Sequence, residues 1–297
     1  MIQRILVIGT GFLGQQILLD ATNFKKNVLG TSLSSTNSMM KLDIRKIDSI
    51  SNCISEFEPD MIINCAANVN LDFLENNPDL AFSINSEGAK NVALVAKKKC
   101  IKLVHISTDG VFDGAKGMYS ENDSPNPINV YGKSKFLGEK LIQENLEDHI
   151  IIRTNFYGIN QKNTGLLNWI IQRLSDGERI IGFDNIIFNP LHVSDLSKLI
   201  LEIAQSDYRG VLHLASNDVL SKFEFAVKVA DIFHLNKNLI TKGTSNDIDL
   251  IATRPRNTSL SNKKSQKILN AKINSLNGSL ITMKNNFETS YTKKLGR

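Results

Sequence analysis

Tyr131 and Lys135 have the types and spacing expected of a catalytic pair. They stand at positions i and i+4, so on a helix they share one face. A tyrosine ordinarily has a pKa of about 10 and exchanges protons poorly at neutral pH. A neighbouring ammonium group stabilises the phenolate and lowers that pKa. The pair could therefore give or take a proton during catalysis, although a solvated helix pair has the same spacing.

A second polar group, Ser107-Thr108-Asp109, follows an apolar run that reads as a strand. Open parallel sheets bind their ligands at the carboxyl ends of strands. A hydroxyl at this position could polarise a carbonyl group. Thr108, Tyr131 and Lys135 are thus the catalytic candidates.

A glycine motif, Gly9-Thr10-Gly11-Phe12-Leu13-Gly14, joins a short β-rich run to a helical segment. Glycines let the backbone turn tightly and approach a pyrophosphate, and the helix N-terminus supplies free N–H groups. This context predicts dinucleotide binding. The expected contacts are Gly9, Gly11, Phe12, Leu13 and Gly14.

The residues after the second predicted strand bear on the choice of cofactor. A dinucleotide site for NAD usually has an acidic residue there, which binds the ribose hydroxyls. The stretch 29–35 contains hydroxyl side chains and no acid, which favours NADPH, with NADH as the alternative. We expect Thr31 and Ser32 at the ribose, and Asp43 with Ile44 at the adenine.

Short apolar runs alternate with helical segments along the first half of the chain. This alternation predicts βαβ units and a parallel sheet covered on both faces. Strands are expected at 5–8, 27–30, 61–64, 101–106, 149–153 and 211–215. Helices are expected at 12–21, 46–57, 78–98, 131–145, 163–174 and 222–233.

The fold expected is an α/β, Rossmann-type, doubly wound parallel sheet with a small C-terminal α/β substrate domain. The dinucleotide-binding domain is placed at 1–160, with later segments able to return to it. Residues 161–297 are assigned mainly to substrate binding.

Composition excludes several classes of protein. Hydrophobic residues make up 41% of the 297 residues, which argues against intrinsic disorder. No apolar run is long enough to cross a membrane, and no signal peptide is visible. Three scattered cysteines argue against a disulfide scaffold and suit a reducing compartment, so the cytoplasm is expected. The net charge is +5, but aromatic residues are sparse, so nucleic acid is not an expected partner.

Further blocks of sequence make the chain resemble the extended short-chain dehydrogenase/reductases, and within them the dTDP-4-dehydrorhamnose reductase family. These blocks are Asn64-Cys65-Ala66-Ala67, residues 85–92, Ser107-Thr108-Asp109 with residues 111–114, Tyr131-Gly132-Lys133-Ser134-Lys135, Arg153-Thr154 with Tyr157-Gly158, and residues 254–260. They span about residues 5 to 260.

The resemblance implies hydride transfer from NAD(P)H to C4 of a 4-keto-6-deoxy nucleotide sugar. It implies that Thr108 (or Ser107) polarises the ketone, that Tyr131 gives the proton, and that Lys135 holds the nicotinamide ribose and tunes Tyr131. It adds Cys65, Ala66 and Ala67 to the cofactor site. The implied substrate contacts are Ser107, Asp109, Val111, Phe112, Asn155, Arg254 and Arg256.

The resemblance also implies a homodimer, packed through the Tyr131 helix and the helix at 78–98. Some family members bind a divalent cation through acidic residues. Gln15 and Gln16 follow Gly14 here, so no metal is expected. Gly110 stands where these reductases typically carry a tyrosine facing the substrate, so the sugar specificity can differ. Asn155-Phe156 replaces the usual Ser-Trp.

Two other functions stay open. A nucleotide-sugar epimerase or dehydratase would recycle a tightly bound NAD. The family also resembles the regulatory beta subunit of methionine adenosyltransferase, which suggests a cofactor-binding subunit without turnover. Outside the motifs, His105 is expected to be a packed strand residue, Cys65 to serve packing, and His192 with Asp195 to be structural.

Overall fold

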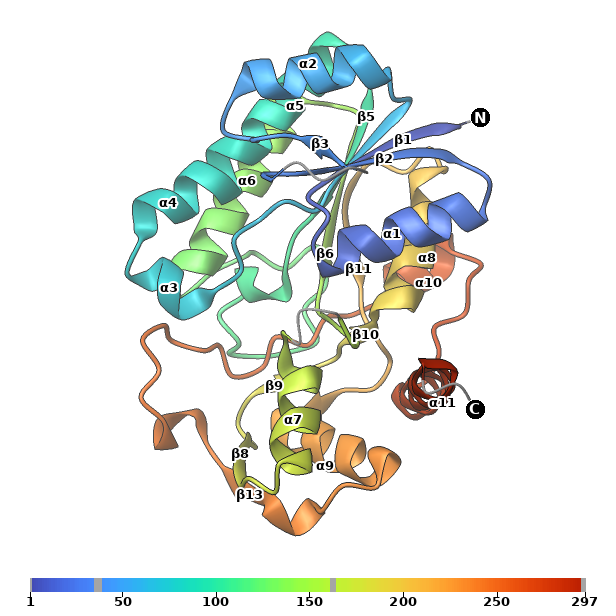
Figure 1. The fold of residues 1–297 in the computed structure, drawn as a ribbon. Coiled ribbons are helices and arrows are strands. Elements are labelled where there is room, and N and C mark those ends of the chain that lie inside the picture. The colour runs from blue at the N-terminus through green and yellow to red at the C-terminus, as the bar shows by residue number, and fades with distance from the viewer. Residues whose placement is uncertain (1, 35–38, 161–163, 295–297) are drawn as a thin grey trace.

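A seven-stranded sheet forms the centre of the larger domain (Figure 1). The computed structural model describes residues 2–34, 39–160 and 164–294. The strands lie in the order β11-β6-β5-β4-β1-β2-β3, and every neighbouring pair is parallel. Their bounds are β1 (Arg4–Ile8), β2 (Asn27–Ser32), β3 (Met40–Lys41), β4 (Met61–Asn64), β5 (Lys102–Ile106), β6 (His149–Thr154) and β11 (Gly210–Leu214). The expected Rossmann-type parallel sheet is confirmed.

The strand order reverses at β1. Strands β2 and β3 lie on one side of it, and β4, β5, β6 and β11 lie on the other. In such sheets ligands bind in the crevice outside the carboxyl ends of the strands at this reversal. The turns after β1, β4 and β5 therefore converge on one edge of the sheet.

Helices cover both faces of the sheet (Figure 1). Helices α1 (Phe12–Asn23), α8 (Val193–Ala204) and α10 (Lys263–Ile268) pack on one face. The other face is covered by α2 (Ile47–Phe57), α5 (Ala89–Lys98) and α6 (Val130–Asn145). Both faces of the central strands are buried, which explains why β4 and β6 are apolar runs without alternation.

The single helix expected at 78–98 is interrupted by a wider turn. It comprises α4 (Pro78–Phe82), a π-helical turn η1 (Ser83–Gly88) and α5. Within η1, the Asn85 carbonyl oxygen would lie 2.3 Å from a Cβ atom at Gly138 of α6. The Asn85 side chain also bonds the backbone of Asn68 and the hydroxyl of Ser134. Such turns are frequent at functional sites, and this one ties the loop after β4 to α6.

A smaller domain lies beside the carboxyl edge of the sheet (Figure 1). Its core joins helices α7, α9 and α11 through residues such as Ile170, Phe225 and Leu280. The remaining elements form the smaller domain or connect other elements. They are α3 (Leu71–Glu75), η2 (Asp109–Val111), β7 (Phe156–Tyr157), α7 (Leu166–Ser175), β8 (Ile180–Phe183), β9 (Ile187–Phe188), β10 (Leu191–His192), β12 (Leu220–Ser221), α9 (Lys222–Phe233), η3 (Lys237–Leu239), β13 (Ile240–Gly243), η4 (Ser245–Asp247) and α11 (Leu276–Lys294). Asn163, the first residue of the helix expected at 163–174, lies outside the described residues.

A segment after residue 160 packs with the larger domain. Helix α8 packs against α1, and β11 extends the sheet beside β6. The apolar side chains of α8 that drive this packing include Leu196, Leu199 and Ile200. No helix in the described ranges is long and apolar enough to cross a membrane.

Candidate active site

The turn between β1 and α1 is built for a close approach to a ligand. Gly9 has φ of +85°, and a Cβ there would lie 2.6 Å from the backbone of Ala66. A Cβ at Gly14 would lie 2.3 Å from the Gly9 carbonyl oxygen. Helix α1 begins after Gly11 without a side-chain cap and without an acidic residue in its first turn. Its free N–H groups suit a phosphate group.

Two adjoining cavities open beside this turn. One, of about 550 Å³, lies over the ends of β1 and β2, and the other, of about 690 Å³, extends toward α6 and the smaller domain. Gly9, Gly11, Cys65 and Ala67 line both cavities. A dinucleotide could therefore lie across the turn with one nucleotide in each cavity.

The first cavity brings together most of the residues expected at the adenosine. Ser32, Asp43, Ile44 and Ala66 line it. Thr31 does not, because its side chain is buried; its carbonyl oxygen instead accepts hydrogen bonds from the amides of Gly9 and Thr10, at 3.2 and 3.0 Å.

Arg45 also lines the first cavity, and the sequence analysis missed it. Its Nε and Nη2 donate to the two carboxylate oxygens of Asp43, at 2.9 and 2.7 Å. These hydrogen bonds hold the pKa of Asp43 below its usual value. The guanidinium thus stands beside the expected ribose position, where the stretch 29–35 offered no cation. The sequence offered one signal for Arg45, which is its position two residues after Asp43, an expected adenine contact.

The second cavity brings Tyr131 and Lys135 together with Ser107 and the loop containing Asn155. Phe12, Leu13 and Gly14 line its cofactor side. Tyr131 lies at the start of α6, where the side chain of Asn129 caps the helix by accepting from the Gly132 amide at 2.8 Å. The cap fixes the turn of the helix that carries Tyr131.

Tyr131 is a phenol in this environment. Burial raises its pKa to about 12, and the hydrogen bond with the Thr108 side chain offsets part of this rise. The expected lowering by Lys135 is not seen, because the Lys135 amine lies against β5. It donates to the Ile106 carbonyl oxygen at 2.7 Å and lies 3.2 Å from Nε2 of His105. A protonated tyrosine is the form that can give a proton to a substrate.

Thr108 and Asp109 hold the turn after β5. The Thr108 hydroxyl donates to Asp109 Oδ1 at 3.1 Å and accepts from the Gly110 amide at 3.0 Å. Asp109 Oδ2 accepts from Asn155 at 3.0 Å and from Thr258 at 2.7 Å. Asp109 therefore ties the turn after β5 to Asn155 and Thr258, and a ketone at Thr108 would compete with it for the hydroxyl proton.

Ser107 is engaged in a buried ionic cluster. Its hydroxyl donates to Glu139 of α6, which also pairs with Arg153 of β6 at 2.7 Å. Both charged side chains are about 95% buried or more. Val111 and Phe112 pack in a separate core with Tyr119, and neither lines the cavity.

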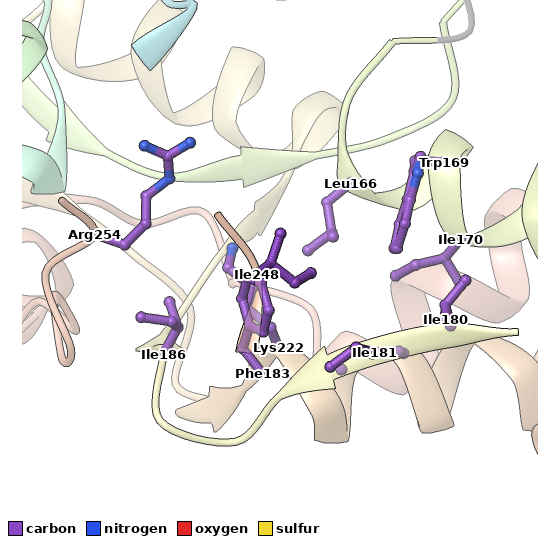
Figure 2. Close-up of a pocket in the computed structure, with 12 residues that line it drawn as sticks. Leu166, Trp169, Ile170, Ile180, Ile181, Phe183, Ile186, Lys222, Ile248 and Arg254 are labelled. Atoms are coloured by element: carbon purple, nitrogen blue, oxygen red, sulfur yellow. The ribbon is translucent and has the colours of Figure 1, made fainter. Parts of the chain in front are cut away.

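A third cavity, of about 270 Å³, adjoins the second one inside the smaller domain. Leu166 and Trp169 of α7 face Ile180 and Ile181 of β8 across it (Figure 2). Lys222 lines both the second and the third cavities, so it stands at their junction.

Few neighbouring groups stabilise the positive charge of the Lys222 ammonium. It occupies the first position of α9, where the helix dipole disfavours positive charge. Its Nζ lies 3.2 Å from the centroid of the Phe188 ring. Burial lowers its pKa to about 8, against the opposing charge of Asp109. Within the described residues this ammonium has no carboxylate partner.

The two arginines expected at the substrate are placed differently. Arg254 lines the third cavity, but its guanidinium is held by Asp72 of α3 at 2.8 Å. Arg256 lines a neighbouring polar hollow with Arg254, and not the catalytic cavity. Lys222 thus lines the catalytic cavity without a carboxylate partner among the described residues, and the sequence analysis had treated it only as part of a helix.

Comparisons with known proteins agree with this architecture. The family model described as "RmlD substrate binding domain" matches residues 3–288. A "probable low-salt glycan biosynthesis reductase" of Haloferax volcanii is 30% identical over 225 residues, covering 74% of this chain and 75% of that protein. The bovine methionine adenosyltransferase 2 subunit beta is 28% identical over 278 residues, covering 87% and 80%.

Among solved structures, dTDP-4-dehydrorhamnose reductase from Bacillus anthracis, in complex with NADP, is a close match. It superposes with a TM-score of 0.87 at 28% identity, covering 95% of this chain and 99% of that one.

Proposed function

This chain belongs to the RmlD substrate binding domain family, and on that premise we propose that it is an NADPH-dependent reductase of a nucleotide sugar. The proposed reaction reduces the C4 ketone of a 4-keto-6-deoxy sugar, with dTDP-4-dehydrorhamnose as substrate and dTDP-L-rhamnose as product. The observation that carries the proposal is that Tyr131 and Lys135 line one cavity beside the glycine turn, with Tyr131 hydrogen-bonded to the side chain of Thr108. The resemblance to the reductase of Bacillus anthracis supports it.

The residues around the cavity suit each step of this reaction. The cofactor supplies the hydride, and the turn at Gly9 with the N-terminus of α1 would hold its phosphates. Lys135 would bind the nicotinamide ribose through its amine. Thr108 would orient the ketone oxygen toward Tyr131. The Tyr131 phenol would then protonate the oxygen as negative charge develops on it.

Arg45 supports NADPH as the cofactor, since a guanidinium binds phosphate through paired hydrogen bonds. We predict that Arg45→Ala weakens NADPH binding about tenfold, because an exposed charge-assisted contact of this kind contributes about 1.4 kcal/mol. NADH binding should stay unchanged. Fluorescence titration with both cofactors measures this, with Lys46→Ala as the matched control. Equal loss for both cofactors would contradict a 2′-phosphate contact.

Lys222 supports an anionic substrate, since its ammonium faces the junction of the catalytic and apolar cavities. The sugar would occupy the catalytic cavity, the diphosphate would lie at Lys222, and the base would enter the apolar cavity. We predict that Lys222→Met raises KM for the nucleotide sugar about 10- to 100-fold, the loss expected for one hydrogen bond to a charged group.

The control for Lys222 is Lys228→Met on the same helix, which lines neither cavity. Steady-state kinetics should place the effect on KM for the sugar nucleotide and leave the KM for NADPH unchanged. An unchanged KM for the sugar nucleotide would place the diphosphate elsewhere.

A regulatory function is the second candidate, because the methionine adenosyltransferase beta subunits align with 87% of this chain. It predicts that the protein binds NADPH, turns over no sugar, and alters the activity of an added methionine adenosyltransferase catalytic subunit. An epimerase or dehydratase predicts instead that NAD copurifies with the protein.

The test of the proposed function is NADPH oxidation after addition of enzymatically made dTDP-4-dehydrorhamnose. Sustained, substrate-dependent oxidation is expected. Absence of oxidation by protein that still binds NADPH would reject this substrate. Gly110 would then be the position to vary, since a Cβ there would lie 3.7 Å from the Tyr131 ring.

A further inference from the structure

A line of buried polar side chains connects the cofactor turn to Lys135. Asn64 ends β4 and His105 is its register partner on β5. Asn64 Nδ2 lies 3.2 Å from His105 Nδ1, and His105 Nε2 lies 3.2 Å from Lys135 Nζ. Asn64 is fully buried and His105 is 1% exposed. The expectation that His105 merely packs in its strand omitted these contacts.

The backbone fixes the orientation of the Asn64 amide. Its Oδ1 accepts a hydrogen bond from the Ala66 amide at 3.1 Å. Turning the amide over would set its NH₂ group against the Ala66 N–H and lose that bond. Ala66 cannot easily move, because it lies against Gly9 at a distance that excludes a Cβ. Asn64 therefore donates to His105, and Nδ1 of His105 must accept.

This orientation determines where His105 carries its proton. Burial holds the pKa of His105 well below its usual value, so the ring is neutral. A neutral imidazole has one N–H group. Since Nδ1 accepts, the proton is on Nε2, which faces Lys135.

An Nε2–H group needs an acceptor, and an ammonium has none. A neutral amine can accept from His105 while donating to the Ile106 carbonyl oxygen, which lies 2.7 Å from Nζ. All the hydrogen-bonding groups of Asn64, His105 and Lys135 that face one another are satisfied only in this arrangement.

We propose that Asn64 and His105 are positioning residues that favour the neutral amine of Lys135 over its ammonium form in the cofactor-free protein. Burial acts in the same direction and lowers the pKa of Lys135 to about 8. Glu139 and Cys65 act in the opposite direction, but the Glu139 charge is balanced by Arg153. Tyr131 on the same helix is an uncharged phenol. The inference rests on the proposed function only for the cofactor-binding role of Lys135.

With a pKa of about 8, Lys135 changes charge near physiological pH. Below its pKa the amine takes a proton from solvent, and His105 must then accept through Nε2. That change requires the imidazole proton to move to Nδ1, where the Asn64 amide donates. The Asn64 orientation thus opposes the ammonium form.

The test is nitrogen-15 NMR of the cofactor-free protein, with the His105 signals assigned by their absence in His105→Gln. We expect the chemical shifts of the Nε2–H tautomer at mildly alkaline pH. The opposite tautomer, or a charged ring, would overturn the proposal. The tautomer itself is read from the unaltered protein, and the variant serves only to assign the signals.

The Lys135 titration is the second readout, followed through its side-chain ¹³Cε signal. In His105→Gln, the glutamine amide oxygen can accept a hydrogen bond from Lys135. In Asn64→Asp, the carboxylate can accept a hydrogen bond from the Nδ1–H group of His105, so that Nε2 can accept from Lys135. Each should raise the Lys135 pKa by about one unit or more. His149→Gln, a buried histidine at the start of β6, should leave it unchanged.

Unchanged Lys135 titration in both variants would overturn the proposal. Neither readout uses a sugar nucleotide, so its outcome is separate from that of the proposed function. If the protein shows the Nε2–H tautomer but no reductase activity, this inference stands and the proposed function is rejected.

Discussion

Tyr131→Phe is expected to lower kcat/KM for the keto-sugar nucleotide by about 10²- to 10⁴-fold, the usual contribution of a positioned general acid. The phenol is hydrogen-bonded to the Thr108 side chain, and burial raises its pKa to about 12. It therefore remains protonated at neutral and moderately alkaline pH, so the loss should be similar across that range. NADPH oxidation with the variant and the parent protein measures it.

The loss should be confined to the chemical step. NADPH binding to Tyr131→Phe should match that of the parent protein, because phenylalanine keeps the ring against the cavity wall. Tyr208→Phe is the control, since the Tyr208 hydroxyl donates to the Val211 carbonyl oxygen away from the cavity. If Tyr131→Phe retained turnover within about tenfold of the parent, another group would have to give the proton.

Glu139→Gln is expected to destabilise the fold by about 3–5 kcal/mol, the cost of leaving one partner of a buried ion pair without its opposite charge. Glu139 accepts from Arg153 at 2.7 Å and from Ser107, one turn of α6 away from Lys135. Glutamine keeps the shape and an acceptor oxygen, but the Arg153 charge remains buried. Urea unfolding followed by circular dichroism measures the change.

The double variant Glu139→Leu/Arg153→Met separates charge from packing. Removing both charges should cost less than Glu139→Gln alone, because no uncompensated charge remains in the core. Glu144→Gln on the exposed side of the same helix should change stability by less than about 0.5 kcal/mol. A Glu139→Gln effect as small as that of the control would mean that water or a shifted proton compensates Arg153.

Local patterns were sufficient for the parts of the site that are continuous in sequence. Gly9 and Gly14 stand between a strand and a helix, and that context predicted a turn that the structure confirms. Tyr131 and Lys135 share one helical face, so their spacing predicted their common cavity. The strand runs of β4 and β6 predicted a sheet covered on both faces.

Residues that reach the site through the strand order were not predictable from sequence. His105 meets Lys135 because β5 lies beneath α6, and Lys222 meets the catalytic cavity because α9 begins at the domain junction. Neither belongs to a local motif. Arg45 was missed because the cation was sought directly after β2, whereas the ends of β2 and β3 lie side by side.

Motif resemblance also extended too far at Val111 and Phe112. The resemblance implied that both contact substrate. The turn η2 after β5 directs them into a core with Tyr119 and Leu260, where they are fully buried. A local motif does not fix side-chain direction, because that depends on backbone geometry.

The most direct test of the central claim is deuterium transfer from NADPH labelled at the reactive C4 position. The labelled cofactor is incubated with the protein and dTDP-4-dehydrorhamnose, and the product is analysed by mass spectrometry and NMR. We predict a reduced sugar nucleotide with one deuterium at sugar C4, and deuterium transfer about 10²- to 10⁴-fold slower with the Tyr131→Phe variant. An unreduced sugar nucleotide without deuterium, from protein that still binds NADPH, would contradict it.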